Sequence, residues 1–495
     1  MAASPSSTAP QRLTFGIELE ILVPYLWADQ PDPAGDTDRR DVIRLSAEAR
    51  CHGDSFVARE EIQNILRNFL RAHDIAVYDD GVQGAGLPSR YSVGQDSSVR
   101  EPKFTMYKWV GVEIRSPALV AEAGSFDEIK RVVTLLRNRF RLRLNDTTGF
   151  HVHVGMGAHK LPPRTIRRLA QLLWCAEGTL SQLHPPERML NQFCPSIRHS
   201  SHLARGGLEH WRVAERESLN LAEYLGRSTS PAEDQEDPTE VSNRLAVLQQ
   251  STNSFSALNS RLDPLRLQRF PPVRANPYGI EGARRRHHSK WGRELTPLTR
   301  RGFLEQGLLH PHEVGMATLE PSESCTSVVD GLSVLCQQEM YAETARAVNE
   351  LSGYIGQRFN YNLLAYEFQD LGDLEIRRTV EFREAAGSLD PPWVAAWSRI
   401  CSRIVEFCLE ATEGVFVDVL MRVVEAELAF EVSGEEMRYD VVDLLNDLGL
   451  RDEAKLVEKI LMGDRDVFWF PCALEENSSG DATGASIMVA PGSES

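Results

Sequence analysis

The sequence predicts an α+β protein, for two reasons. Four short segments far apart in the chain alternate strictly between apolar and polar residues, as β-strands do, at residues 15–21, 110–117, 149–155 and 379–384. Longer windows elsewhere repeat apolar residues at the spacing of an amphipathic helix, and they make up most of the last third of the chain. We therefore expect a β-sheet with flanking helices and a helical C-terminal third.

The helical windows begin and end at residues with a clear conformational preference. The second window follows Pro162 and Pro163, and proline is common where a helix starts. Gly449 divides the last window into two helices, because glycine favours the end of a helix. The windows are residues 126–142, 164–183, 393–412, 417–431 and 439–463.

The composition is that of a globular protein without a basic surface. The 495 residues are 42% apolar and 25% charged, and 54 Lys and Arg against 71 Asp and Glu give a net charge of -17. This acid excess argues against nucleic acid and membrane as partners, because both require a basic face. The eight cysteines form no C-x-x-C pair, and residues 1–11 lack the features of a secretory leader. We therefore expect free thiols and a cytoplasmic protein.

The polar positions of the four strands have an unusual composition. Alternation turns Ile17, Leu19 and Ile21 to one face and leaves acids, histidines and arginines on the other. If the strands share a sheet, the polar face holds Glu18, Glu20, Glu113, Arg115, His151, His153, Glu381 and Arg383. An antiparallel sheet often has one solvated face, but such faces are normally rich in Thr, Lys, Ser and Gln. Glycines at 16, 111 and 155 flank the polar residues, where a ligand can require close approach to the backbone.

This set of side chains suits divalent cations and phosphate. Carboxylates crowded on one face repel one another unless cations neutralise them. Oxygen ligands with one or two histidines favour Mg²⁺ or Mn²⁺ over zinc or copper. Arginines beside such ions can grip phosphoryl oxygens, and phosphoryl transfer needs both. The chain has no G-x-x-x-x-G-K-[ST] loop, so a nucleotide would have to bind on the sheet through metals.

The strand motifs occur together in the order seen in a known family: G-I-E-L-E, G-V-E-I-R-S-P, G-F-H-V-H-V-G and V-E-F-R-E-A-A-G-S-L-D. This ordered set resembles the amidoligase family of fungi and bacteria, which belongs with glutamine synthetase and glutamate–cysteine ligase in the carboxylate–amine ligase superfamily. The stretches Y-S-V-G-Q-D-S-S-V at 91–99, H-P-P-E-R-M-L-N at 184–191 and R-F-N-Y-N-L at 358–363 extend the resemblance. It spans about residues 13–410 and so most of the chain.

The resemblance implies a glutamine-synthetase-like antiparallel sheet whose polar face binds ATP and two or three Mg²⁺ or Mn²⁺ ions. Enzymes of the superfamily phosphorylate a carboxylate and let an amine attack the acyl phosphate, giving an amide, ADP and phosphate. By their places in the motifs, the implied metal ligands are Glu18, Glu20, Glu113, His153 and Glu381. Arg383 matches the arginine that steadies the transferred phosphoryl group, so Arg383, His153 and Glu381 are the implied catalytic residues.

Other residues are candidates for contacts with the nucleotide or the substrate. Arg115, Arg358 and Asn362 are expected, with Arg383, to contact the nucleotide. The substrate candidates are Asp96, Ser98, His151, Arg188 and Asn191. Each of the five has alternative interpretations. Asp96 and Ser98 could contact a metal or cap a turn, and His151 could share the role of His153 or support it. Arg188 and Asn191 could form a structural cap near a helix end.

The resemblance also suggests the domain organisation. An amidoligase domain is expected at 12–412, with a mobile insertion near 226–294 that contains an acidic and a basic stretch. A helical extension is expected at 413–474, and disordered ends at 1–11 and 475–495.

Two other functions remain open at this point. One is a zinc-dependent hydrolase that uses the pair His151 and His153, with His159 nearby. The other is a non-catalytic nucleotide-binding protein of the same fold. For the ligase, the expected partners are a small-molecule or peptide carboxylate and an amine. The oligomeric state stays open, since superfamily members range from monomers to large rings.

Overall fold

A computed structural model gives the structure of the chain. It describes residues 12–33, 35, 38–46, 55–79, 88–100, 106–145, 147–184, 188, 193–201, 203–204, 328–337, 348, 358–366, 378–433 and 439–462. The predicted disordered ends, the predicted insertion near 226–294 and the candidate Asn191 lie outside these residues.

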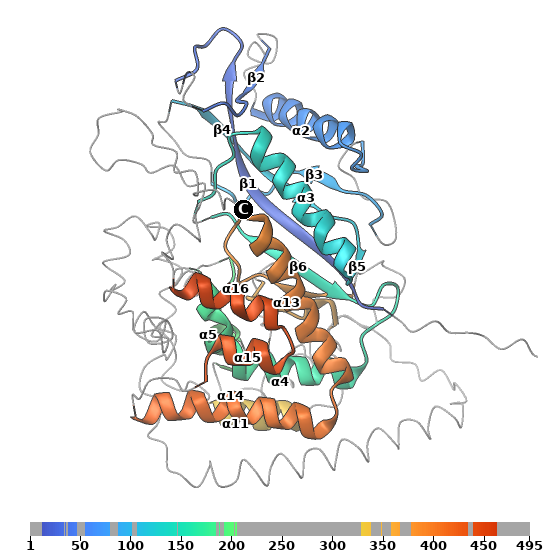
Figure 1. Ribbon diagram of the computed structural model, residues 1–495, viewed down its shortest axis with the longest axis vertical. Coiled ribbons are helices and arrows are strands. Elements are labelled where there is room, and N and C mark those ends of the chain that lie inside the picture. The colour runs from blue at the N-terminus through green and yellow to red at the C-terminus, as the bar shows by residue number, and fades with distance from the viewer. Residues whose placement is uncertain are drawn as a thin grey trace, which may run out of the picture.

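All four predicted strands belong to one sheet, which has the order β3–β4–β1–β6–β8–β7 and is antiparallel at every step of this path (Figure 1). These strands are β1 (Thr14–Trp27), β3 (Ser92–Gly94), β4 (Lys108–Arg115), β6 (Phe150–Gly155), β7 (Tyr361–Asn362) and β8 (Val380–Phe382). The short strands β2 (Ile43–Leu45) and β5 (Leu119–Val120) also pair with β1, in parallel and antiparallel orientation respectively. The predicted α+β class with an antiparallel sheet is therefore confirmed, with β2 as a parallel exception.

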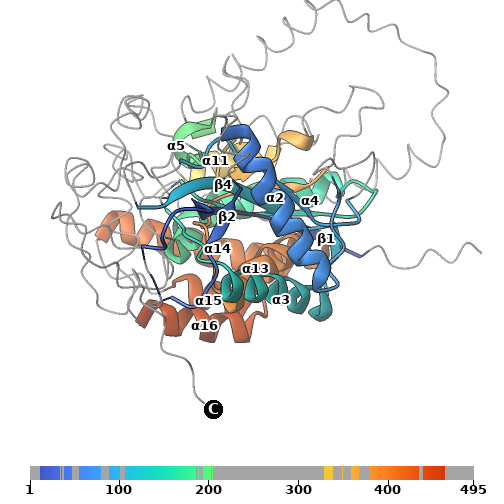
Figure 2. The ribbon, with the colours of Figure 1, turned by 90° about the horizontal axis from the view of Figure 1, so that it is seen from above.

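Helices α3 and α13 cover the apolar face of the sheet and lie on the same side of it (Figures 1 and 2). Phe126 of α3 stacks on Phe15 of β1, with ring centroids 4.7 Å apart. Trp397 of α13 meets the ring of Phe382 of β8 edge-on. The helices are α2 (Ser55–Ala72), α3 (Ala123–Arg139), α4 (Pro163–Leu180), α5 (Ile197–Ser200), α11 (Val328–Gln337), α13 (Pro391–Glu410), α14 (Glu413–Ser433), α15 (Val441–Asp447) and α16 (Arg451–Met462).

The helical windows predicted from the sequence correspond to α3, α4, α13, α14 and the pair α15–α16. Gly449 separates the last two, with φ near +80°, which is the left-handed conformation that glycine adopts readily. Helices α14 and α15 pack against α4, and α13 links α4 to the sheet. One hydrophobic core therefore joins the sheet to the C-terminal helices.

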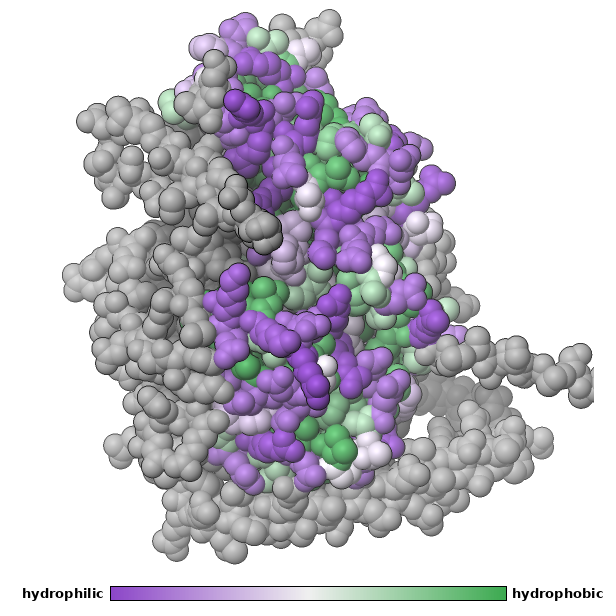
Figure 3. All heavy atoms as spheres, in the orientation of Figure 1, coloured by the Kyte–Doolittle hydropathy of each residue, from purple (hydrophilic) through white to green (hydrophobic). Residues whose placement is uncertain are grey.

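None of the described helices is long and apolar enough to cross a bilayer. On the face seen in Figure 3, the described residues are mostly hydrophilic, with apolar residues scattered among them. The large exposed hydrophobic residues, Phe56, Met106 and Val415, belong to different parts of the chain.

The contact between α4 and α11 leaves no room for a side chain at Gly331. Trp174 of α4 is fully buried, and its Nε1 donates a hydrogen bond to the carbonyl of Val328, 3.1 Å away. A Cβ at position 331 would overlap the indole ring, well inside van der Waals contact. We expect Gly331→Ala to lower the free energy of unfolding by about 1–3 kcal/mol, because the buried indole must move.

Urea unfolding of Gly331→Ala, followed by tryptophan fluorescence, measures this loss. Gly414→Ala is the matched control, because position 414 lies near the start of α14 and a Cβ there meets nothing within 4 Å. That control should be neutral or gain up to about 1 kcal/mol, since alanine favours a helix over glycine. An unfolding midpoint for Gly331→Ala equal to that of the wild type would contradict the expected clash.

Candidate functional site

The register of the sheet brings the predicted polar residues together on one face. Glu18 of β1 lies directly opposite both Arg115 of β4 and His151 of β6. Glu20 lies opposite Glu113. Residues directly opposite one another in antiparallel strands project to the same side, so these side chains share a surface. In the same way His153 of β6 lies opposite Glu381 of β8, which in turn lies opposite Asn362 of β7.

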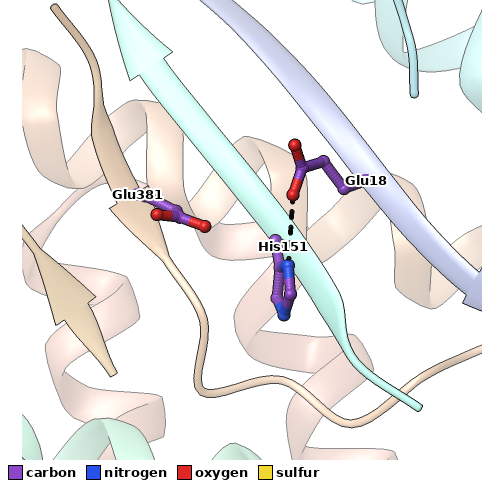
Figure 4. A group of neighbouring side chains, drawn as sticks. All are labelled: Glu18, His151 and Glu381. Carbon is purple, nitrogen blue, oxygen red and sulfur yellow. Dashed lines mark hydrogen bonds and ion pairs between the residues drawn. The ribbon is translucent and has the colours of Figure 1, made fainter. Parts of the chain in front are cut away.

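The first group of possible metal ligands consists of Glu18, His151 and Glu381, which come from three neighbouring strands (Figure 4). Each offers a donor atom, and these atoms lie within 4.8 Å of one another. His151 Nδ1 is 3.3 Å from Glu18 Oε2. His153 lies alongside, with Nε2 3.3 Å from Glu18 Oε1 and 3.7 Å from Glu381 Oε1. Both predicted histidines therefore face the same carboxylates.

The second group consists of Glu20, Asp96 and Glu113, whose donor atoms also lie within 4.8 Å of one another. Glu20 and Glu113 are buried, and Asp96 is half-buried just after β3. Ser98 contacts this group through Asp96, because its backbone N–H and its hydroxyl both donate to Asp96 Oδ1, at 2.6 and 2.5 Å. The structure thus places Asp96 among the carboxylates and Ser98 where it orients Asp96.

Three arginines surround the two groups. Arg115 forms an ion pair with Glu113, and its Nε lies 3.4 Å from Glu18 Oε1. Arg383 forms an ion pair with Glu381, and its Nη1 lies 3.4 Å from His151 Nδ1. Arg358, half of whose side chain is exposed, lies 3.6 Å from Glu381. Positive groups therefore lie at both ends of the acidic face.

The charges of the first group offset one another. Burial would raise the pKa of Glu18, but the neighbouring His153 and His151 bring that pKa well below its usual value. Burial acts on Glu381 in the same way, and His153 and Arg383 outweigh it and lower the pKa to about 2. Burial lowers the pKa of His153, and the carboxylates of Glu18 and Glu381 raise it above its usual value. The carboxylates of this group are therefore ionised at neutral pH.

The second group differs, because one of its carboxyls holds a proton at neutral pH. Burial and the negative charge of Glu18 raise the pKa of Glu113 to about 9, although Arg115 acts against this rise. Asp96 and Glu20 contribute further repulsion. Three carboxylates buried close together repel one another when all are ionised. A bound cation could neutralise them in place of the proton.

Both groups fit a hard divalent cation. Each offers two or three carboxylates, and oxygen-rich ligand sets of this kind suit Mg²⁺ and Mn²⁺. The exposed His159 lies in the turn that follows β6 and belongs to neither ligand group, so a third histidine for a zinc site is not supplied there.

Arg188 and Asn362 support the site from the side. Arg188 is buried, and its guanidinium donates to the carbonyls of Glu384 and Arg383, at 3.2 and 3.0 Å. The amide nitrogen of Asn362 donates to Glu381 Oε2 over 2.7 Å. In the described structure these residues therefore hold the strand of Glu381 and Arg383 in place.

Two of the three glycines that flank the polar residues are packed tightly against other parts of the chain. A Cβ at Gly111 would lie 3.0 Å from Val99, and one at Gly155 would lie 3.1 Å from the carbonyl of Arg378. Packing within the chain therefore explains these two glycines better than a ligand does. The close approach occurs instead at Gly149, the first residue of the G-F-H-V-H-V-G motif, where a Cβ would lie 2.6 Å from His151 Nε2. The glycine at the start of this motif could have indicated a close approach. Strand periodicity could not show which side chain it approaches.

Fold and site together define an α+β protein whose antiparallel sheet has a carboxylate-rich face with two groups of possible metal ligands. Residues 11–247 match the model of the family described as "Putative amidoligase enzyme". This match covers the part of the chain that contributes Glu18, Glu20, Glu113 and both histidines, and it supports an amidoligase family assignment. No curated protein and no solved structure shows a significant match to the chain.

The raised pKa of Glu113 predicts a stability that falls with pH when metals are absent. An ordinary Glu has a pKa near 4.5, and in the fold the value is about 9, so the folded state holds an extra proton between these values. The contribution of Glu113 to stability is fully present below about pH 4.5 and is lost as pH rises toward 9, by up to about 1.4 kcal/mol per pH unit. Thermal unfolding in EDTA from pH 5 to pH 9 measures this slope.

Glu113→Gln should flatten the profile, because glutamine holds no ionisable proton. Asp452→Asn is the control, because Asp452 is exposed on α16 and its loss should leave the slope unchanged. Equal slopes for the wild type and Glu113→Gln would contradict a raised pKa at this position.

Proposed function

We propose that the protein is an ATP- and Mg²⁺-dependent carboxylate–amine ligase with a glutamine-synthetase-like core. The observation that supports it best is the pair of carboxylate groups side by side on one sheet face, joined through Glu18 and Glu20 of β1 and flanked by Arg115 and Arg383. The match of residues 11–247 to the amidoligase family model supports the amide-forming activity. The substrates would be a small-molecule or peptide carboxylate and an amine.

Glu18, His151 and Glu381 would hold one cation, and Glu20, Asp96 and Glu113 a second. Cations held there would neutralise the charge of the ATP phosphates and draw them onto the face. His153 faces Glu18 and Glu381 and would complete the first set or contact a phosphoryl oxygen. Of the two ligands that the sequence leaves open for Asp96, a metal or the substrate, the metal is the one proposed here.

The proposed reaction has two steps. An oxygen of the substrate carboxylate attacks the γ-phosphorus, the bond to the β,γ-bridging oxygen breaks, and ADP leaves. The amine nitrogen then attacks the acyl carbon, the carbon–oxygen bond to phosphate breaks, and the nitrogen loses a proton. Arg383 lies beside Glu381 and His151 and would stabilise the negative charge on the phosphoryl oxygens as they transfer. Arg115 and Arg358 would bind the other oxygens of the nucleotide or the acceptor.

The experiment is an ADP-release assay with ATP, Mg²⁺ and a panel of amino acids, peptides and amines. For any active pair, a carboxylate labelled with ¹⁸O should deliver one labelled oxygen to the phosphate product, because the acyl carbon–oxygen bond breaks. Glu20→Gln should abolish the release. A wild-type protein that neither binds ATP with Mg²⁺ nor releases ADP with any pair would sink the proposal. Stoichiometric zinc in protein purified without added metal would favour the hydrolase instead.

A further inference from the structure

We propose that Asn360 and Glu177 form a buried positioning pair that fixes Arg383 and Asn362 on the sheet face. The inference rests on the proposed function, in that it assigns the pair to the same site. Neither residue is a member of the two carboxylate groups, and they come from segments far apart, Glu177 from α4 and Asn360 from just before β7. Both are buried, with exposures of 0% for Glu177 and 3% for Asn360.

Asn360 joins three segments through its backbone and its side chain. Its N–H donates to the carbonyl of Pro195 over 2.9 Å. Its side-chain Oδ1 accepts from the N–H groups of Ile197 and Tyr361, at 3.1 and 3.0 Å. Its side-chain nitrogen donates to Glu177 Oε1 over 2.5 Å. The side chain therefore needs an acceptor and a donor at once, which an amide supplies.

Glu177 completes the arrangement from the helix side. Its second oxygen, Oε2, accepts from the hydroxyl of Ser196 over 2.9 Å and from the backbone N–H of Arg198 over 3.3 Å. The carboxylate thus ties the segment 195–198 to Asn360 from inside the core. A buried network of this kind holds one geometry when all its members are paired.

The consequence for the site is direct. The carbonyl of Asn360 accepts the N–H of Arg383 over 2.7 Å, which sets the backbone of that arginine. Two residues further along, Asn362 donates to Glu381. Arg188 holds the same backbone from another direction through the carbonyl of Arg383. Movement of Asn360 would therefore shift the arginine and a metal-binding carboxylate together.

The contact between the two side chains has a polarity that can be inverted. Asn360→Asp alone would place a carboxylate oxygen against the carboxylate of Glu177, where the two repel. Glu177→Gln alone would leave one donor facing another, because the new NH₂ must point either at the NH₂ of Asn360 or toward the backbone N–H of Arg198. The double variant Glu177→Gln/Asn360→Asp restores a donor facing an acceptor and keeps the net charge. The amide oxygen that this variant carries at position 177 can still accept from Ser196 and Arg198, and the new carboxylate at position 360 can accept from the neighbouring N–H groups.

The experiment compares the wild type, both single variants and the double variant in two measurements. Hydrogen exchange followed by mass spectrometry reports the peptides that contain Arg383 and Ile197, whose N–H groups are bonded to Asn360. Titration with MgATP reports the site. We expect faster exchange and affinity lowered by about tenfold or more in each single variant, and affinity within about threefold of the wild type in the double variant.

Asp440→Ala serves as the control, because it removes the N-cap of α15 outside the sheet. It should lower the unfolding midpoint with MgATP affinity unchanged, which separates positioning from general stability. The pairing would be overturned if the single variants had the exchange rates and MgATP affinity of the wild type. It would also be overturned if the double variant had an affinity no higher than that of the weaker single variant. Exchange needs no ligand, so a wild type that fails to bind MgATP would count against the ligase while exchange still decides the pairing.

Discussion

Arg383→Lys should reduce ATP-dependent turnover by about a thousandfold, because the arginine bridges groups that a single ammonium cannot reach together. Its Nη1 contacts Glu381 and lies 3.4 Å from His151 Nδ1, while Nη2 donates to the carbonyl of Phe193 over 3.4 Å. Glu381 keeps the pKa of Arg383 above its usual value despite burial, so the charge is permanent. A planar, fixed charge is what a transferring phosphoryl group requires.

The measurement is the steady-state rate of ADP release, with the unfolding midpoint of each variant recorded beside it. Arg358→Lys is the matched comparison, since Arg358 also faces Glu381 but is half exposed, and we expect its loss to stay near tenfold. Arg383→Ala should regain part of its rate when guanidinium is added, because the missing group is supplied from solution. A rate for Arg383→Lys within about threefold of the wild type would show that this arginine does not stabilise the transfer.

Alternation along the strands was enough to predict which residues share the polar face. A side chain in a strand points opposite to its neighbours, so Glu18 and Glu20 had to lie together once β1 formed. The same rule applied to His151 with His153 on β6. The order of the motifs then suggested one sheet, and the register confirmed it by setting Glu18 between Arg115 and His151.

Contacts between distant segments could not be predicted in the same way. Asp96 joins Glu20 and Glu113 through a turn after β3, and a turn has no periodicity that would reveal its side-chain direction. The bond between Glu177 and Asn360 spans more than a third of the chain, and the helical pattern of α4 gives no sign of it. Such pairings depend on how whole elements pack, which local sequence does not encode.

Gly149→Ala should weaken the binding of divalent cations by about a hundredfold, although the change adds one methyl group. The new Cβ would lie 2.6 Å from His151 Nε2 and 3.2 Å from Glu20 Oε2, so it would press on one ligand from each group. The backbone cannot retreat easily, because the Gly149 N–H donates to Glu20 Oε2 over 2.6 Å and its carbonyl accepts the Glu20 N–H. The imidazole and the carboxylate must therefore move.

Titration of Mn²⁺ by electron paramagnetic resonance measures this loss without any substrate. Gly94→Ala is the matched control, because Gly94 of β3 lies directly opposite Glu113 of the second group and a Cβ there meets nothing within 4 Å. Its Mn²⁺ affinity should equal that of the wild type. Equal affinity in Gly149→Ala would mean that His151 and Glu20 do not hold the cation, and the ligand groups would then have to be drawn from the other carboxylates of the face. If Mn²⁺ affinity falls in Gly149→Ala but not in Gly94→Ala, the cation is bound next to Gly149. There the backbone that leads into β6 contacts His151 of the first group and Glu20 of the second.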